Sequence, residues 1–238
     1  MRGGGEACWR IEREVGYVVL DNPPMNVLTD ALRGGILEAF EHFERDRVRA
    51  VVVTGAGERA FCGGADLREE AGLAPETVGD FQRRAEAVGD AIRAFAGPVI
   101  AAVNGWAMGG GLTLALWCDV RIGSTAARLG AVGVKVGLIA SNVQLRRLLP
   151  EGRARDALLT GRTLDAGEAY RMGLLSAVVP PGRLLAEAGL WAARAAALDP
   201  DTVAATKRLI NGALDVTLEE AEAQERRAVG EGAAAAAP

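Results

Sequence analysis

Two glycine-rich segments are the parts of this sequence whose residue types and spacing could do chemistry. They read FCGGADL at 61–67 and NGWAMGGG at 104–111. Each follows an apolar run and leads toward a helical pattern, which predicts a turn between a strand and a helix. Two free backbone N–H groups that meet at such turns can stabilise a developing negative charge on one oxygen. For either segment alone, tight packing of a strand against a helix is the simpler interpretation.

A third segment has the glycine spacing of a dinucleotide-binding turn. Gly55, Gly57 and Ala60 follow an apolar run in the pattern G-x-G-x-x-A. That fingerprint requires a helix from the second glycine and then an acidic residue at the end of another strand. Here the turn is followed by FCGG at 61–64, which contains two more glycines and does not predict such a helix. The sequence therefore favours a structural turn over a nicotinamide site.

Histidine and cysteine usage excludes several chemistries. His42 is the single histidine, and it lies opposite the apolar stripe of a predicted helix, so we expect it at the surface. Catalytic triads and histidine metal sites need a histidine in the pocket. Cys8, Cys62 and Cys118 are too few and too scattered for a disulfide framework or a zinc site. We therefore expect no metal, reduced thiols and a cytoplasmic protein without a signal peptide.

The composition is that of an ordinary soluble domain. Of 238 residues, 50% are hydrophobic and 24% charged, with a net charge of -4. This excludes a disordered chain and argues against a nucleic-acid partner. No charge occurs between Arg93 and Asp119, but Pro98, Asn104 and three glycines interrupt this apolar span. We therefore predict a buried strand and helix here and no membrane segment.

The pattern of strands and helices around the two glycine-rich segments predicts an α/β core that positions them. Short β-branched runs predict strands at 17–20, 50–54 and 99–103, and residues 120–140 predict a strand followed by an extended loop. Helices are predicted around Ile36 and Phe40, over the LTLALWC run at 112–118, and at 141–149, where Pro150 ends the pattern. From Gly152 onward the pattern is helical, with Asp165 and Glu168 at capping-box spacing and long runs at 183–198 and 202–230. The last residues, 230–238, are low in complexity and predict a frayed tail.

The two glycine-rich segments together resemble those of the enoyl-CoA hydratase/isomerase (crotonase) superfamily. The pieces that carry the resemblance occur in the family's order: NPPMNVL, AVVVTGAGERAFCGGADLRE, GPVIAAVNGWAMGGGLTLALWCDVRI, LRRLLPEGRARDALLTGRTLDAGEAYRMGLLSAVV and ATKRLIN. The resemblance implies an α/β fold, a spiral of ββα units over 1–180, with a helical trimerisation region over 181–238. It also implies a homotrimer or dimer of trimers that binds an acyl-CoA thioester, with no cofactor besides the CoA of the substrate.

The resemblance assigns roles by motif position. The backbone N–H groups of Ala65 and Gly110 would hold the thioester carbonyl and stabilise an enolate. The other positions would line the substrate site: Met25, Val27, Cys62, Asp66, Leu67 and Arg68 at the CoA entrance, Trp106 and Met108 in the acyl pocket, and Val132 and Val136 as further apolar lining. Structural roles stay open for several of them: Asp66 as a helix cap, Arg68 as a solvated charge, Cys62 as a small packed residue, and Trp106, Met108, Val132 and Val136 as core.

The sequence departs from the family at the residues that move protons. Hydratases of the family carry two glutamates at the positions of Thr113 and Gly133, and some relatives use an aspartate at the position of Ser141. A hydroxyl does not titrate near neutral pH and glycine has no side chain, so neither replaces a carboxylate. Ser141 looks like the N-cap of a helix. Lys135 would share a strand face with Gly133 if this segment is extended, although a surface or CoA-phosphate contact is the better interpretation.

Two hypotheses follow. In the first, the protein is a lyase or isomerase of the family that acts on acyl-CoA, for example in fatty acid metabolism, and uses the backbone amides without the glutamates. Its ordinary hydratase activity is then near background. In the second, it is a non-catalytic acyl-CoA carrier or sensor. The family's basic, aromatic C-terminal tail is replaced by GAAAAAP, so we expect the adenine end of CoA to be held differently.

Overall fold

A computed structural model describes residues 6–71 and 78–235, and it contains two stacked sheets. The larger sheet has the order β1-β2-β3-β5-β7-β10, from strands β1 (Glu6–Glu12), β2 (Val15–Asp21), β3 (Ala50–Gly55), β5 (Val99–Val103), β7 (Val120–Ser124) and β10 (Ala177–Val179). The smaller sheet has the order β4-β6-β8-β9, from β4 (Ala60–Cys62), β6 (Trp106–Met108), β8 (Arg128–Gly130) and β9 (Thr163–Asp165). All neighbours are parallel except β1 with β2 and β8 with β9.

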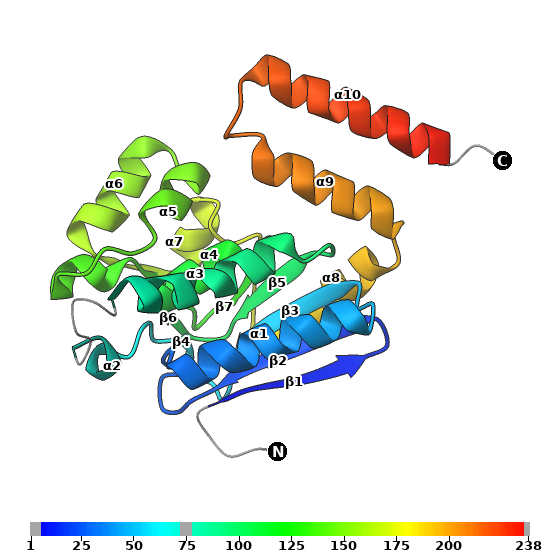
Figure 1. Cartoon of the computed structure of the whole chain (residues 1–238). Helices are drawn as coiled ribbons and strands as arrows, with labels where there is room; N and C mark the ends of the chain where they lie inside the picture. Colours follow the sequence, from blue (N-terminus) through cyan, green and yellow to red (C-terminus); the bar gives the residue numbers. More distant parts are fainter. Residues whose placement is uncertain (1–5, 72–77, 236–238) are drawn as a thin grey trace.

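The strand order shows a spiral in which each turn gives one strand to each sheet. The pairs β3 and β4, β5 and β6, and β7 and β8 follow one another in the chain, and their members lie side by side in the two sheets. Helices α1 (Asp30–Arg45), α3 (Val78–Ala94) and α4 (Gly110–Trp117) alternate with these strands. The carboxyl ends of the smaller sheet's parallel strands therefore collect at one edge, where the glycine turns lie (Figure 1).

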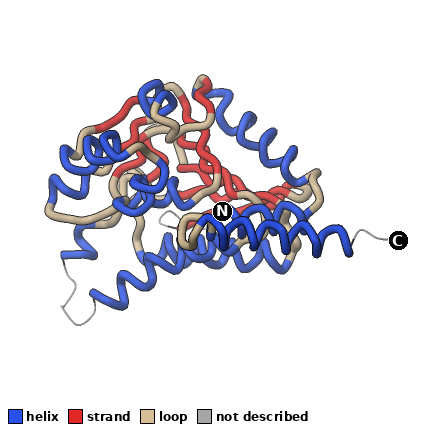
Figure 2. The backbone as a smooth tube through the Cα atoms, turned by 90° about the horizontal axis from the view of Figure 1, so that it is seen from above, coloured by secondary structure: helices blue, strands red, loops and turns tan. Residues whose placement is uncertain are grey.

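Alternating side chains on the strands build two apolar layers. On β3, Val51 and Val53 face the core between the sheets, whereas Ala50 and Val52 face the opposite side. Helix α8 (Leu184–Ala196) covers that second side with Leu184, Ala188, Ala192 and Ala196. The larger sheet is thus buried on both faces, which explains its nearly continuous apolar strands. Figure 2 shows the strands gathered among the helices.

The remaining helices lie between the strands of the smaller sheet and after it along the chain. They are α2 (Leu67–Ala71), α5 (Asn142–Leu148), α6 (Glu151–Thr160), α7 (Ala166–Arg171), α9 (Pro200–Gly212) and α10 (Leu218–Ala235), with short 3₁₀ helices at Val132–Val136 and Pro181–Arg183. Helices α9 and α10 extend away from the body (Figure 1). Buried Lys207 ties α9 to the core, because its Nζ donates to the carbonyls of Ile92 and Gly97 at 3.0 Å and pairs with Asp119 at 2.8 Å. The predicted boundary at 180/181 stays a prediction.

The uncharged span between Arg93 and Asp119 forms β5, β6 and α4, so it is divided among buried elements. Within the described ranges, no helix combines the length and the hydropathy that crossing a membrane requires. The turn at Gly55 and Gly57 leads into β4 and not into a helix. The turn is therefore not followed by the helix that the dinucleotide-binding fingerprint requires. A Cβ on Gly55 would lie 2.1 Å from the carbonyl oxygen of Ala60, so only glycine fits.

Several predicted elements were incomplete or wrong. Strand β1 was missed, although Ala7, Trp9 and Ile11 alternate and pack on the core. The segment 120–140 is not a strand and extended loop but β7, β8 and a 3₁₀ helix. The run 202–230 is two helices, because Thr217 and Glu220 form a capping box that begins α10.

The predicted frayed tail was also partly wrong. Helix α10 continues to Ala235, consistent with the high helix propensity of alanine, and residues 236–238 lie outside the described residues.

Candidate active site

The two glycine-rich turns pack directly against each other. A Cβ on Gly64, which has φ +107°, would lie 2.7 Å from the carbonyl oxygen of Met108. A Cβ on Gly111 would lie 2.0 Å from the carbonyl oxygen of Cys62. Side chains at either position would push the turns apart, so these glycines allow the close backbone approach.

This packing brings two backbone amides together. A Cβ built on Gly110 would lie 3.4 Å from the amide nitrogen of Ala65, so this nitrogen is adjacent to Gly110. Gly110 is the first residue of α4, where the N–H groups have no partner within the helix. In the part of the chain that the structure describes, neither amide donates to another protein atom. Two free donors thus lie beside each other at the start of a helix.

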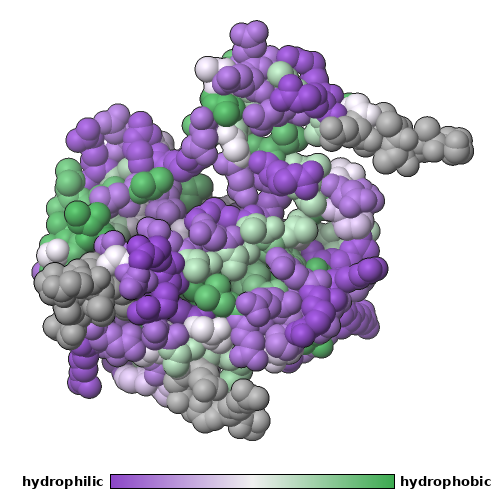
Figure 3. All heavy atoms as spheres, in the orientation of Figure 1, coloured by the Kyte–Doolittle hydropathy of each residue, from purple (hydrophilic) through white to green (hydrophobic). Residues whose placement is uncertain are grey.

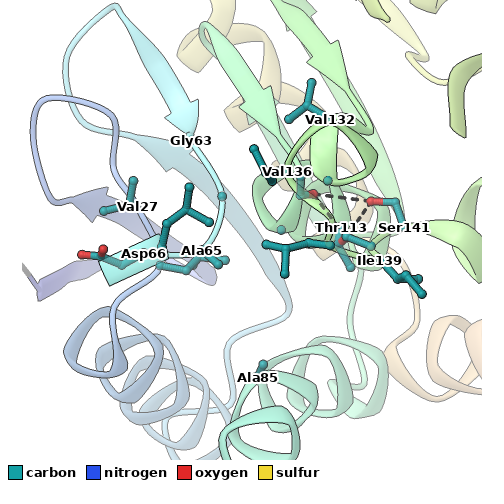
Figure 4. Close-up of a pocket in the computed structure, with 18 of the residues that line it drawn as sticks. Val27, Gly63, Ala65, Asp66, Ala85, Thr113, Val132, Val136, Ile139 and Ser141 are labelled. Carbon is teal, nitrogen blue, oxygen red and sulfur yellow. Dashed lines mark hydrogen bonds between the residues drawn. The ribbon is translucent and has the colours of Figure 1, made fainter. Parts of the chain in front are cut away.

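Ala65 and Gly110 line a pocket of about 1160 Å³, to which the spiral and α3 both contribute residues. In Figure 4, Val27, Ala65 and Asp66 lie on one side, Thr113, Ser141 and Ile139 lie on the other, and Ala85 of α3 lies below. Most of the predicted site residues line it: Met25, Val27, Ala65, Asp66, Leu67, Arg68, Gly110, Thr113, Val132, Gly133 and Val136, together with Lys135 and Ser141. The Asp66 side chain also accepts from the Arg68 amide at 2.9 Å, as expected of a helix cap.

Three residues assigned to substrate binding are not among those that line this pocket. Cys62 is completely buried on β4. Met108 is buried, and its sulfur lies beside Gly130 of the neighbouring strand. Trp106 is 42% exposed on β6, at the other end of this three-residue strand from the turn at Gly109. Cys62 and Met108 lie in short strands whose neighbouring residues Phe61 and Ala107 are also buried, so packing on both faces of these strands removes them from solvent.

Burial also decides the protonation of Cys62. Desolvation raises the pKa of this thiol to about 12, although Arg33 opposes the shift. The thiol is therefore neutral near pH 7 and a poor nucleophile. Cys8 and Cys118 are likewise free, and burial raises the pKa of Cys118 to about 12 as well.

Thr113 and Ser141 form a pair of hydroxyls in the pocket wall. Their Oγ atoms lie 2.7 Å apart, and each lies near the carbonyl oxygen of Gly109, at 3.3 and 3.4 Å respectively (Figure 4). The expectation that Ser141 is the N-cap of α5 was right about its position but wrong about a capping hydrogen bond from its side chain. Ser141 does occupy the N-cap position, but its side chain makes no capping hydrogen bond and its backbone is left-handed, with φ 65°.

Gly133 and Lys135 do not share the face of an extended strand, because Val132–Val136 is a 3₁₀ helix. A Cβ on Gly133 would lie 2.8 Å from the carbonyl oxygen of Leu138, so the backbone leaves no space for a side chain there. Lys135 is exposed, and its aliphatic stem passes over Gly161. The valine-rich sequence suggested a strand, but the glycines on both sides of Lys135 permit the tighter turn.

The sequence reasoning missed the contribution of two helices to this pocket. From α3, Gln82, Ala85 and Glu86 line it; their spacing of three and four residues places them on one helix face, a signal that the sequence carried. Glu86 adds an exposed carboxylate to the pocket. The residues near Thr113 in the sequence gave no sign of it, because Glu86 belongs to a different helix. Buried Arg33 of α1 also lines the pocket and pairs with Glu69 of α2 at 3.7 Å.

A parallel double-sheet spiral with paired glycine turns at a helix start defines the crotonase class of α/β proteins. The family model described as "Enoyl-CoA hydratase/isomerase" matches residues 10–236. The chain therefore belongs to the enoyl-CoA hydratase/isomerase family, as the glycine-rich motifs predicted.

Relatives and solved structures agree with this assignment. The chain is 37% identical over 219 residues to a probable enoyl-CoA hydratase of Rhizobium meliloti, covering 90% of this chain and 84% of the relative. It is 36% identical over 214 residues to the (E)-benzylidenesuccinyl-CoA hydratase of Thauera aromatica, covering 88% and 83%. The crystal structure of the enoyl-CoA hydratase from Bacillus anthracis superposes with a TM-score of 0.90 at 32% identity, covering 95% of this chain and 90% of that one.

Proposed function

We propose that this protein binds an acyl-CoA thioester and stabilises its enolate with the amides of Ala65 and Gly110. The observation that carries the proposal is the 3.4 Å between the Ala65 amide nitrogen and the Cβ position of Gly110, at the start of α4. Two donors so placed suit a carbonyl oxygen that gains negative charge, and each contributes about 100- to 1,000-fold in rate. The names of the relatives, which are acyl-CoA hydratases, support this substrate class.

We further propose that ordinary hydration of enoyl-CoA is near background. The addition of water requires a base and an acid, and each contributes about 100- to 10,000-fold. Thr113 and Gly133 stand where hydratases of the family carry glutamates, and the space at Gly133 is closed by Leu138. A substrate that needs only enolate stabilisation suits this site better.

A crotonyl-CoA hydration assay tests the reaction. We expect a rate close to that of buffer alone, measured by loss of the enoyl thioester absorbance. Turnover at ordinary hydratase rates would contradict the proposal. In that case Glu86→Gln would tell whether the pocket carboxylate on α3 performs the missing proton transfer.

A second candidate function is a non-catalytic acyl-CoA carrier or sensor. The same observation favours it, because the amide pair persists where Thr113 and Gly133 replace the proton-transfer groups. Purified protein is mixed with a panel of acyl-CoA thioesters, and both the thermal shift and the products are measured by mass spectrometry. Conversion of any thioester supports the enzyme. Binding across the panel without conversion supports the carrier.

The proposal includes no cofactor beyond the CoA of the substrate. We also propose a homotrimer or dimer of trimers and a cytoplasmic location. The apolar side chains of Ile210 on α9, Leu214 in the turn that follows it and Leu218 on α10 are 66% to 76% exposed, which suits burial by further subunits. Figure 3 shows such apolar surface among the hydrophilic side chains of these two helices.

A further inference from the structure

Two asparagines, Asn22 and Asn26, hold a segment of the chain that forms part of the pocket wall. Met25, Val27 and Leu28 of this segment line the pocket, whereas the two asparagines are not among the described residues that line it. Asn26 is buried, with 2% of its surface exposed, and Asn22 is half-buried. Because buried amide side chains are hydrogen-bonded, their partners show which parts of the backbone they fix.

The side chain of Asn26 joins this segment to the turn that leads into β4. Its Nδ2 donates to the carbonyl oxygens of Ala56 at 3.1 Å and Ala60 at 2.8 Å, and its Oδ1 accepts from the Asn22 amide at 3.2 Å. Both N–H groups and the oxygen of the side chain therefore have partners. The backbone of Asn26 is left-handed, with φ 52°, a conformation in which asparagine is enriched. Asn26 thus anchors Asn22 to a buried turn.

Asn22 begins a series of hydrogen bonds that ends at the Ala65 amide. Its Nδ2 donates to the carbonyl oxygen of Val27 at 2.9 Å. The N–H of the same peptide group belongs to Leu28, and it donates to the carbonyl oxygen of Gly64 at 2.8 Å. The N–H of that second peptide group is the Ala65 amide. We call the Asn22 side chain and these two peptide groups the amide relay.

The amide relay fixes the direction of the Ala65 N–H. A peptide group is planar, and in its trans form the C=O and N–H point in opposite directions. Both peptide groups of the relay are trans. The bond from Leu28 to the Gly64 carbonyl therefore directs the Ala65 N–H away from Leu28. Hydrogen bonds in series also polarise one another, so the relay makes the last N–H a stronger donor.

A second hydrogen bond holds the turn against rotation about this contact. The Gly63 amide donates to the carbonyl oxygen of Met25 at 2.7 Å, and Leu28 and Ala65 pair as an isolated parallel bridge. The peptide groups on both sides of Gly64 are thus fixed by the segment 25–28. The orientation of the Ala65 amide consequently depends on the side chains that anchor this segment.

We propose that Asn22 and Asn26 are positioning residues, which act through the amide relay to orient and polarise the Ala65 N–H toward the thioester oxygen. This inference rests on the proposed function, because the acceptor of the last N–H is the carbonyl oxygen of the bound thioester. Asn22 supplies the first donor of the relay, and Asn26 keeps Asn22 in place. Both act from behind the pocket wall.

Infrared spectroscopy of butyryl-CoA bound to the full-length protein tests the inference. A carbon-13 label in the thioester carbonyl identifies its stretching band, whose frequency falls as the hydrogen bond to the oxygen strengthens. Asn22→Ala removes the first donor of the relay, and Asn26→Gly removes the anchor but suits the positive φ. Phe95→Leu is the control for a general loss of stability, because Phe95 is 2% exposed and packs against Phe40 in the core.

We expect butyryl-CoA to absorb at a lower frequency on the unmodified protein than in solution. Asn22→Ala and Asn26→Gly should each move the frequency back toward the free value and weaken binding about two- to tenfold, the value of one net hydrogen bond. Phe95→Leu should change neither. If Asn26→Gly does not fold, Asn22→Ala at its half-buried position decides the outcome.

Two results would overturn the inference while the proposed function stands. They are an unchanged carbonyl frequency in Asn22→Ala, and a shift in Phe95→Leu as large as that in the asparagine variants. If the unmodified protein does not bind butyryl-CoA, or binds it without lowering the carbonyl frequency, the proposed function itself is wrong.

Discussion

At Gly133, where the resemblance places a glutamate in hydratases of the family, the backbone as well as the residue type leaves no room for a side chain. The 3₁₀ helix Val132–Val136 returns the chain so closely that the Leu138 carbonyl occupies the space of a side chain. Replacing this glycine by glutamate would therefore require the loop to move. At Thr113, where the resemblance places the other glutamate, the prediction concerns only the type of side chain.

The close approach of the Leu138 carbonyl to Gly133 predicts that Gly133→Ala lowers the stability of the protein. A Cβ at 2.8 Å from the Leu138 oxygen forces a shift of the backbone, and overpacking of this kind costs about 1–3 kcal/mol. Denaturant unfolding should show this loss. Gly152→Ala is the matched control: Gly152 is exposed in α6, nothing lies within 4 Å of its Cβ position, and alanine there should be neutral or stabilising. A Gly133→Ala variant as stable as this control would show that the loop yields easily.

At the scale of elements, Arg162 joins α6 to α7 beside the second sheet. Its guanidinium contacts Asp156 of α6 at 2.6 Å and Glu168 of α7 at 2.7 Å. The hydrogen bonds from Arg162 lower the pKa of both carboxyls below their ordinary values of 3.8 and 4.5. A carboxyl whose pKa is lowered on folding stabilises the folded state above its ordinary pKa, and this contribution is lost as the pH falls.

The Arg162→Met variant should therefore have a lower melting temperature than the unmodified protein at pH 7. The difference should shrink as the pH falls below about 4, where both carboxylates become protonated. Thermal unfolding followed by circular dichroism at a series of pH values measures it. Arg194→Met, at an exposed position on α8, provides the control for loss of one positive charge. A difference that is constant with pH would mean that Arg162 acts by packing and not through its ion pairs.

At the scale of the whole molecule, α9 and α10 carry apolar side chains that the single chain does not bury. Lys207 and the pair of Arg147 with Asp215, at 2.7 Å, fix these helices to the body, so their outer surfaces are held in a defined position. An exposed apolar surface on a rigid support suits contact with other subunits.

Light scattering after size-exclusion chromatography should give three or six times the mass of the chain. The double variant Ile210→Glu and Leu214→Glu should shift it toward the monomer, because it places charges in the proposed interface. Leu159→Glu, at a leucine of α6 that is 71% exposed, tests whether the effect belongs to the C-terminal helices. An unmodified protein that is monomeric at micromolar concentration would refute the proposed assembly.

The sequence alone determined the features that depend on local patterns. Apolar runs that end at glycine turns predicted β3, β5 and the start of α4. The sequence alone sufficed here because the spacing of apolar residues along a short segment indicates which of them are buried. The glycine-rich motifs at Gly64 and Gly110 predicted the family, which the comparisons confirmed. That Thr113 and Gly133 stand at the positions of the family's two glutamates stays a prediction of the resemblance.

Only the tertiary structure decided what depends on contacts between distant segments. Short strands such as β9 and β10 form because neighbouring strands pair with them, and their sequences alone carry little signal. The same holds for Arg33 in the pocket, and for the hydrogen bond between Thr113 and Ser141, which are 28 residues apart in the chain. For Glu86 the sequence showed a shared helix face with Gln82 and Ala85, and only the structure showed that this face lines the pocket. Packing also buried Cys62 and Met108, because the elements that cover β4 and β6 come from distant parts of the chain and the motif does not specify them.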